Sequence, residues 1–85
     1  MFLARVYVVL KPTVSDPQGK TIAAGLRQMD FASVRSVRAG KYMEIRLDGE
    51  SEVEAGRTVD AMCEKLLANP VIEEYHYDLE RVSEP

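Results

Sequence analysis

The stretch Cys63-Glu64-Lys65-Leu66-Leu67-Ala68-Asn69-Pro70-Val71-Ile72-Glu73 decides how this chain folds. It contains the end of an amphipathic helix, a stop at Asn69-Pro70 and the start of an apolar strand. Asn tolerates the left-handed conformation that ends many helices, and Pro just beyond the end cannot continue one. The stretch therefore predicts a direct passage from a helix into a strand.

The strands on either side are predicted from runs of β-branched and aromatic residues. Residues 2–11 are rich in Val, Tyr and Leu, and their even positions are all apolar, so these should face the core. Three of the odd positions are apolar as well, which is typical of a central strand covered on both faces. Residues 33–37 and 41–48 predict two further strands joined by a tight turn at 38–40, in preference to a bulge within one bent strand, and 71–79 predicts the last strand.

A first helix is predicted after a loop at 11–14. Its start has two interpretations: Ser15 with Gln18 as a capping box, or Asp16 as the N-cap with Pro at the first helical position. Helical spacing then places an apolar stripe along one face. Gly25 in the helix interior suggests close packing against a neighbour. The stripe consists of Ile22, Leu26 and Met29, with Ala23 beside it.

The second helix begins at a clear capping box, Ser51 to Glu54. Helical periodicity predicts one continuous apolar stripe after it, formed by Ala55, Val59, Met62, Cys63, Leu66 and Leu67. The element order is β-α-β-β-α-β, which predicts an α+β, ferredoxin-like fold: a four-stranded antiparallel sheet with two helices on one face. We expect a single domain over residues 1–80 and a C-terminal tail at 81–85.

Size and composition restrict the possible functions. A domain of 85 residues buries only roughly 60% of its unfolded surface, which favours self-association. The net charge of −3 argues weakly against nucleic-acid binding. One cysteine and one histidine cannot form an internal disulfide or a four-ligand zinc site. No apolar run approaches the ~20 residues that cross a bilayer, so a soluble, cytoplasmic protein is expected.

The chain offers no set of residues for catalysis, cofactor binding or metal binding. Cys63 lies on the predicted apolar stripe, where a free thiol behaves as a small hydrophobe. Glu73 and Glu74 are adjacent on a strand and so point to opposite faces. The basic turn from Arg38 to Lys41 has two interpretations, a solvated turn or a contact for a partner or phosphate.

The sheet face opposite the helices is the strongest physical signal for binding. We call it the open face. Side-chain parity places apolar residues on it, and contiguous exposed apolar area usually marks an interaction site. We therefore predict self-association through Leu3, Tyr7, Val9, Tyr42 and Ile72, ringed by Arg5, Glu44, Arg46, Glu74 and His76.

Three segments resemble one small family. They are Lys11-Pro12 with Asp16-Pro17-Gln18-Gly19, then Val37 to Tyr42 with Glu44, and then Cys63 to Glu73. In order and spacing they are similar to the PurS family, the small subunit of bacterial and archaeal phosphoribosylformylglycinamidine synthase. The resemblance covers about residues 2–80. One departure is Asp30, where relatives commonly have Gly at the helix end.

The resemblance implies a non-catalytic subunit of an ATP-dependent glutamine amidotransferase complex in purine biosynthesis. It would bridge a glutaminase subunit and a large synthetase subunit and help ammonia pass between them. ATP and magnesium would be used by the synthetase, and this chain would bind no cofactor. A homodimer or higher homo-oligomer is expected. The expected partner contacts are Asp16, Gln18, Arg38, Gly40 and Lys41.

Two other readings share the β-α-β-β-α-β order. An ACT-like dimeric domain would bind an amino acid near a Gly-containing turn after the first strand, but residues 11–15 contain Pro and no Gly. An RNA-recognition module would need stacking aromatics on central strands with basic neighbours. Tyr7 and Tyr42 are suggestive of such a surface, but the chain is acidic overall.

Overall fold

The computed structural model describes residues 1–83 and contains one antiparallel sheet with strand order β2-β1-β3. The strands are β1 (Phe2–Leu10), β2 (Gly40–Leu47) and β3 (Glu73–Arg81). β1 pairs with both neighbours along its length, so Tyr7 lies opposite Tyr42 on one side and His76 on the other. The prediction of a central first strand is thus confirmed. The last strand begins later than predicted and reaches Arg81, while Glu84 and Pro85 lie outside the described residues.

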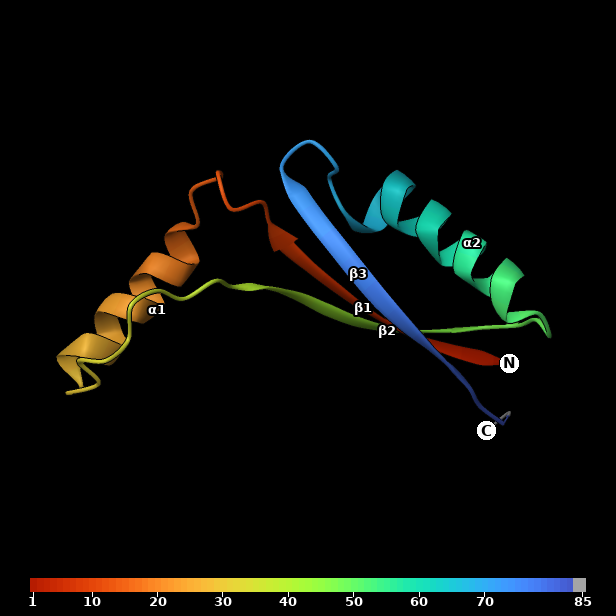
Figure 1. The fold of residues 1–85 in the computed structure, drawn as a ribbon, viewed down its shortest axis with the longest axis horizontal. Coiled ribbons are helices and arrows are strands. Elements are labelled where there is room, and N and C mark those ends of the chain that lie inside the picture. The colour runs from red at the N-terminus through yellow and green to blue at the C-terminus, as the bar shows by residue number, and fades with distance from the viewer. Residues whose placement is uncertain (84–85) are drawn as a thin grey trace.

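The core lies between the sheet and helix α2 (Glu52–Met62), which crosses one face of the sheet (Figure 1). The Ser51 hydroxyl caps α2 by accepting a hydrogen bond from the Glu54 amide at 3.2 Å, as predicted. Apolar area removed from water stabilises this packing at about 25 cal/mol per Å². The buried cluster consists of Ala4, Val6, Val8, Val59, Cys63 and Ala68.

A π-helical turn, η1 (Cys63–Leu67), follows α2 directly. Its wider hydrogen bond runs from the Ala68 amide to the Cys63 carbonyl at 3.0 Å. The wider turn changes which residues face the sheet: Ala68 is buried, whereas Leu66 is 83% exposed. The predicted continuous stripe is therefore wrong at Leu66, because the prediction assumed an unbroken 3.6-residue period.

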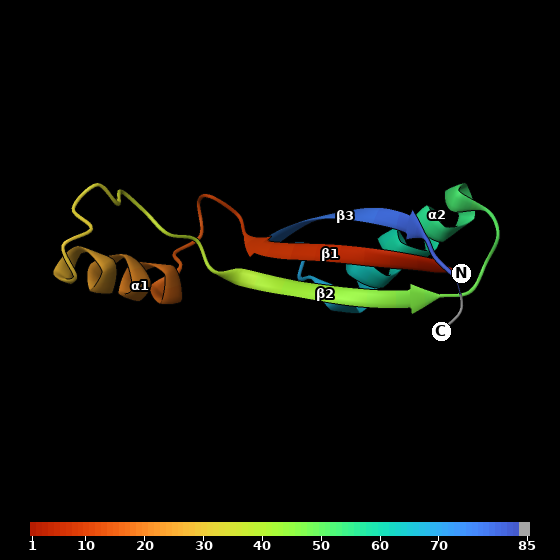
Figure 2. The same cartoon turned by 90° about the horizontal axis from the view of Figure 1, so that it is seen from below.

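Helix α1 (Pro17–Gln28) lies beyond the end of the sheet rather than on its face, as both views show (Figures 1 and 2). We call residues 11–39, which carry α1, the arm, and the rest of the chain the body. The radius of gyration is 16.4 Å, whereas a compact domain of this length has about 12 Å. The apolar stripe of α1 stays largely uncovered, with Ile22 41% and Met29 70% exposed. The close neighbour expected at Gly25 is also missing.

The predicted four-stranded ferredoxin-like sheet with two helices on one face is wrong. The described residues form three strands, and only α2 covers the sheet. Residues 33–37 form no strand, and 38–40 lead straight into β2 instead of turning back (Figure 2). The Arg27 guanidinium donates hydrogen bonds to the carbonyls of Val34 at 3.1 Å and Arg35 at 2.8 Å, which compete with strand pairing. These bonds hold the segment beside α1 and away from β2.

The ends of α1 decide between the two interpretations of its start. Asp16, not Ser15, is the N-cap, and Pro17 is the first helical residue. At the other end Asp30 has a φ of 73°, in the left-handed region. This is the conformation in which Gly ends many helices, and Asp is among the few other residues that adopt it readily. The helix therefore ends in the left-handed conformation with Asp in place of Gly.

We expect Val59→Ala to lower the free energy of unfolding by about 1.5–3 kcal/mol, because Val59 is fully buried and its truncation leaves a cavity. Urea unfolding followed by circular dichroism measures the change. Val53→Ala is the matched control on the same helix, since Val53 is 65% exposed, and it should change stability by under ~0.5 kcal/mol. Equal effects of the two substitutions would contradict the assigned core.

Candidate functional site

The arm joins the body where two of the three motif segments meet. The Asp16 carboxylate accepts one hydrogen bond from the Gly19 amide at 2.9 Å and another from the Ala39 amide at 2.8 Å. One side chain thus caps α1 and ties its start to the residue before β2. Both hydrogen bonds stabilise the charged carboxylate and so lower the pKa of Asp16 below its ordinary value. The bond from Gly19 has the larger effect and that from Ala39 the next. We call this region the junction.

Two glycines allow the backbones to approach closely at the junction. A Cβ at Gly19 would overlap the carbonyl oxygen of Val37, and a Cβ at Gly40 would overlap that of Val8. A larger residue at position 19 would push the start of α1 away from Val37, and one at position 40 would separate β2 from β1. The motif glycines are therefore explained by close approach, because neither has a positive φ.

All five predicted partner contacts gather at the junction. A shallow hollow of about 220 Å³ is lined by four of them, Asp16, Gln18, Gly40 and Lys41, together with Glu73. Glu73 lies 3.8 Å from the Lys41 ammonium and accepts a hydrogen bond from the Asn69 amide. The third motif segment, Cys63 to Glu73, therefore also reaches this place. The turn predicted at 38–40 is absent, but its residues lie together as expected.

A larger basic hollow, which the sequence did not reveal, adjoins the junction. It measures about 610 Å³ and lies between α1, the loop before it and residues 35–38. Among the described residues 1–83, none of its four cations takes part in an ion pair: Lys20, Arg27, Arg35 and Arg38. These cations come from separate stretches of sequence, and only the arm's path brings them together.

The open face carries an aromatic row across the three strands. The Tyr7 ring lies 5.1 Å from Tyr42 and stacks on His76 at 4.6 Å with an interplanar angle of 12°. Tyr42 and Ile72 are 50% and 40% exposed, whereas Leu3 is only 8% exposed. Tyr7, Tyr42 and His76 lie on one face, as parity predicts, whereas Leu3, between its cross-strand partners Arg46 and Glu80, is buried. The accessible apolar area is smaller than predicted.

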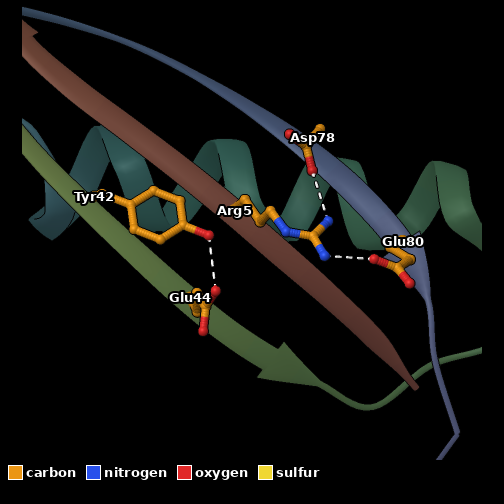
Figure 3. Close-up of polar contacts among 5 residues, drawn as sticks. All are labelled: Arg5, Tyr42, Glu44, Asp78 and Glu80. Atoms are coloured by element: carbon orange, nitrogen blue, oxygen red, sulfur yellow. Dashed lines mark hydrogen bonds and ion pairs between the residues drawn. The ribbon is translucent and has the colours of Figure 1, made fainter.

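Charged residues flank this row on the same face. Arg5 pairs with Asp78 at 3.2 Å and with Glu80 at 2.5 Å, and the Tyr42 hydroxyl donates to Glu44 at 2.8 Å (Figure 3). The hydrogen bond to Glu80, and to a smaller extent the one to Asp78, raise the pKa of Arg5 above its ordinary value. The face therefore combines an apolar strip with a fixed pattern of charge.

No catalytic pair forms from the remaining candidates. Cys63 is fully buried in the core, and desolvation raises the pKa of its thiol, which disfavours the reactive thiolate. His76 lies on the opposite face of the sheet. Within the described part of the chain no group of three metal-ligating side chains occurs. Among the same residues, no helix is long and apolar enough to span a bilayer.

Comparisons with known proteins point to one family. Residues 3–81 match the model of PurS, phosphoribosylformylglycinamidine (FGAM) synthase. The PurS subunit of Bacillus subtilis is 46% identical over 82 residues, which cover 96% of each chain. The PurS subunit of Synechocystis is 44% identical over 75 residues, covering 88% of this chain and 75% of the relative.

Solved structures agree over almost the whole chain. Methanocaldococcus jannaschii PurS superposes with a TM-score of 0.88 at 37% identity, covering 98% of this chain and 100% of that one. PurLQS from Thermotoga maritima contains a chain with a TM-score of 0.83 at 32% identity, covering 94% and 99%. The arm is about a third of the residues, so scores this high require a similarly placed arm.

The junction makes a testable pH-dependent contribution. Because the pKa of Asp16 is lowered in the folded state, its stabilisation is complete above the ordinary value of 3.8 and is lost as pH falls through the folded pKa. We expect the Gly19 and Ala39 amide shifts to titrate together, with a midpoint below 3.8 in NMR spectra. The Asp16→Asn variant should lose this titration and exchange its arm amides faster, unlike the control Asp48→Asn. Independent midpoints for the two amides would contradict a shared carboxylate.

Proposed function

Because this chain belongs to the PurS family, the small subunit of phosphoribosylformylglycinamidine synthase, we propose that it bridges the glutaminase and synthetase subunits of that enzyme and assists ammonia transfer between them. The match over residues 3–81 is the observation that carries the proposal. A relative of known structure is part of PurLQS in Thermotoga maritima. The chain's role is in purine biosynthesis, within a ligase complex in which ATP and magnesium serve the synthetase. We place that complex in the cytoplasm, where its biosynthetic relatives would act.

The junction is the proposed contact with the other subunits. It joins an elongated arm to a compact body, and it presents exposed Gln18, Arg38 and Lys41 around backbone that Asp16 holds in place. Fixed backbone with exposed polar side chains suits recognition, because little conformational entropy is lost on binding. An ACT-like sensor of amino acids is not favoured, because the family match covers nearly the whole chain.

The open face is the proposed surface for association between copies. Tyr42 and Ile72 supply exposed apolar area, and the Arg5 network supplies charges of both signs in fixed positions. Aromatic and Arg side chains are enriched at the energetic centres of interfaces. This surface borders the junction, because Val9 also lines the junction hollow.

We expect Arg38→Glu to weaken assembly with the two partner subunits and to lower glutamine-dependent synthesis about 10-fold or more, since truncating or reversing an interface charge costs a few kcal/mol. Ammonia-dependent synthesis should fall much less, because the synthetase keeps its own active site. The control is Lys65→Glu, an exposed charge reversal on η1. Equal loss of both activities, or wild-type behaviour of Arg38→Glu, would remove the junction from the interface.

The open face is tested by solution mass. Tyr42→Asp should lower the oligomer order measured by analytical ultracentrifugation, because it places a charge in the apolar strip. Val53→Asp is the control, since Val53 is also an exposed apolar residue but lies on α2. A Tyr42→Asp protein with the wild-type mass would show that copies do not associate through this face.

A further inference from the structure

We propose that the basic hollow of the arm is a binding site for a small molecule that carries a di- or triphosphate together with an apolar group, the chemistry of a nucleoside phosphate. Such binding is a property of the chain by itself. It goes beyond the bridging of the two larger subunits and does not depend on it.

The hollow concentrates positive charge that nothing in the described chain neutralises. The arm contains five cations and two anions. Four of these cations line the hollow, and none of the four forms an ion pair within residues 1–83: Lys20, Arg27, Arg35 and Arg38. Asp16 is the one anion in the lining, and both of its carboxylate oxygens already accept backbone amides. The hollow therefore has a net charge of four minus one, +3, which attracts anions.

The size of this charge favours more than one phosphate group. A phosphate monoester carries about −1.5 to −2 at neutral pH, so a single one would leave part of the charge uncompensated. A di- or triphosphate would neutralise it. Three of the four cations are arginines, and the planar guanidinium matches two phosphate oxygens at once.

Two of the cations are already held in place. The Arg27 guanidinium donates through Nε to the Val34 carbonyl at 3.1 Å and through Nη2 to the Arg35 carbonyl at 2.8 Å. Three of its five N–H donors therefore stay available for a ligand. The Lys20 ammonium donates to the Ser15 hydroxyl at 3.2 Å and keeps two donors. Donors that are ordered before binding lose little conformational entropy when they contact an anion.

The rest of the lining suits the organic part of such a ligand. Ala23 is only 4% exposed, and Val14 and Val37 are half-buried. Apolar area and positive charge thus lie in one hollow of about 610 Å³. Small-molecule sites measure roughly 300–1,000 Å³ and combine apolar walls with a few polar groups. A sugar or base attached to the phosphates would cover the apolar part, which inorganic phosphate would leave exposed.

The hollow lies on a side of α1 that is separate from the apolar stripe. Lys20, Ala23 and Arg27 are spaced three and four residues apart, so they share one side of the helix. At 3.6 residues per turn, the stripe is rotated from them by roughly a third of a turn. No residue of the stripe lines the hollow. A contact that covers the stripe therefore leaves the hollow open to a ligand.

The first experiment is isothermal titration calorimetry of the full chain with ADP, pyrophosphate and AMP. ADP should bind most tightly, because pyrophosphate lacks the apolar group and AMP lacks the second phosphate. Each of these two should bind at least ~10-fold more weakly than ADP. Absence of ADP binding, or equal affinity for either partial ligand, would overturn the proposal. Binding of a hexaglutamate peptide without binding of ADP would assign the hollow to an acidic protein segment instead.

The second experiment compares Arg35→Gln with its matched control Arg46→Gln. Each substitution removes one exposed arginine charge that has no ion-pair partner within residues 1–83, but only Arg35 lines the hollow, whereas Arg46 lies on β2. Arg35→Gln should raise the ADP dissociation constant about 10-fold or more, because charge-assisted hydrogen bonds are lost. Arg46→Gln should change it less than ~2-fold, since salt screens distant exposed charges.

The Arg35→Gln protein should keep its fold, because Arg27 bonds to the backbone carbonyl of Arg35 and not to its side chain. Circular dichroism checks this for both variants. Equal effects of the two substitutions on ADP binding would show attraction to overall charge, and would overturn the assignment to the hollow.

Discussion

The whole structure depends on β1 being paired along both edges. Its even-numbered residues, Phe2 to Val8, are almost completely buried, and its backbone bonds are divided between β2 and β3. Once this strand lies in the middle, β2 and β3 become the two edges of the sheet. The chain between β1 and β2 must then leave at one end of the sheet and return to the same end. The arm is the consequence of that connection.

The junction turns this connection into a defined shape. The Asp16 carboxylate accepts hydrogen bonds from two backbone amides. Fixing this side chain costs little conformational entropy, because it is short and both donors are already ordered. Charge-assisted hydrogen bonds of this kind are stronger than neutral ones. Gly19 then allows α1 to approach Val37, and Gly40 allows β2 to approach β1 at Val8. A few residues thus set the direction of a 29-residue projection, and the function of a connecting subunit depends on such directions.

The distribution of charge divides the molecule in two. The body has a surplus of acidic residues, including Asp78 and Glu80 around Arg5 on the open face, whereas the arm has a surplus of basic ones around its hollow. Surface ion pairs contribute little stability by themselves, so this pattern bears mainly on recognition. The same arrangement suits contacts with copies of itself and with larger partners.

The sequence alone determined what depends on local periodicity and on side-chain chemistry. The central strand, the cap of α2, the α2 core face and the family could be predicted, and the start of α1 could be narrowed to two caps, because alternation, capping residues and motif spacing are local signals. The family resemblance named Asp16, Gln18, Arg38, Gly40 and Lys41 as expected partner contacts, whereas their meeting at the junction follows from the fold. Only the tertiary structure decided that residues 33–37 follow α1 instead of pairing with β2, because the competing bonds come from Arg27, several residues away in sequence. It also decided that η1 turns Leu66 outward and that Leu3 is shielded. These outcomes rest on competition between distant groups for the same backbone and the same space, which no local pattern records.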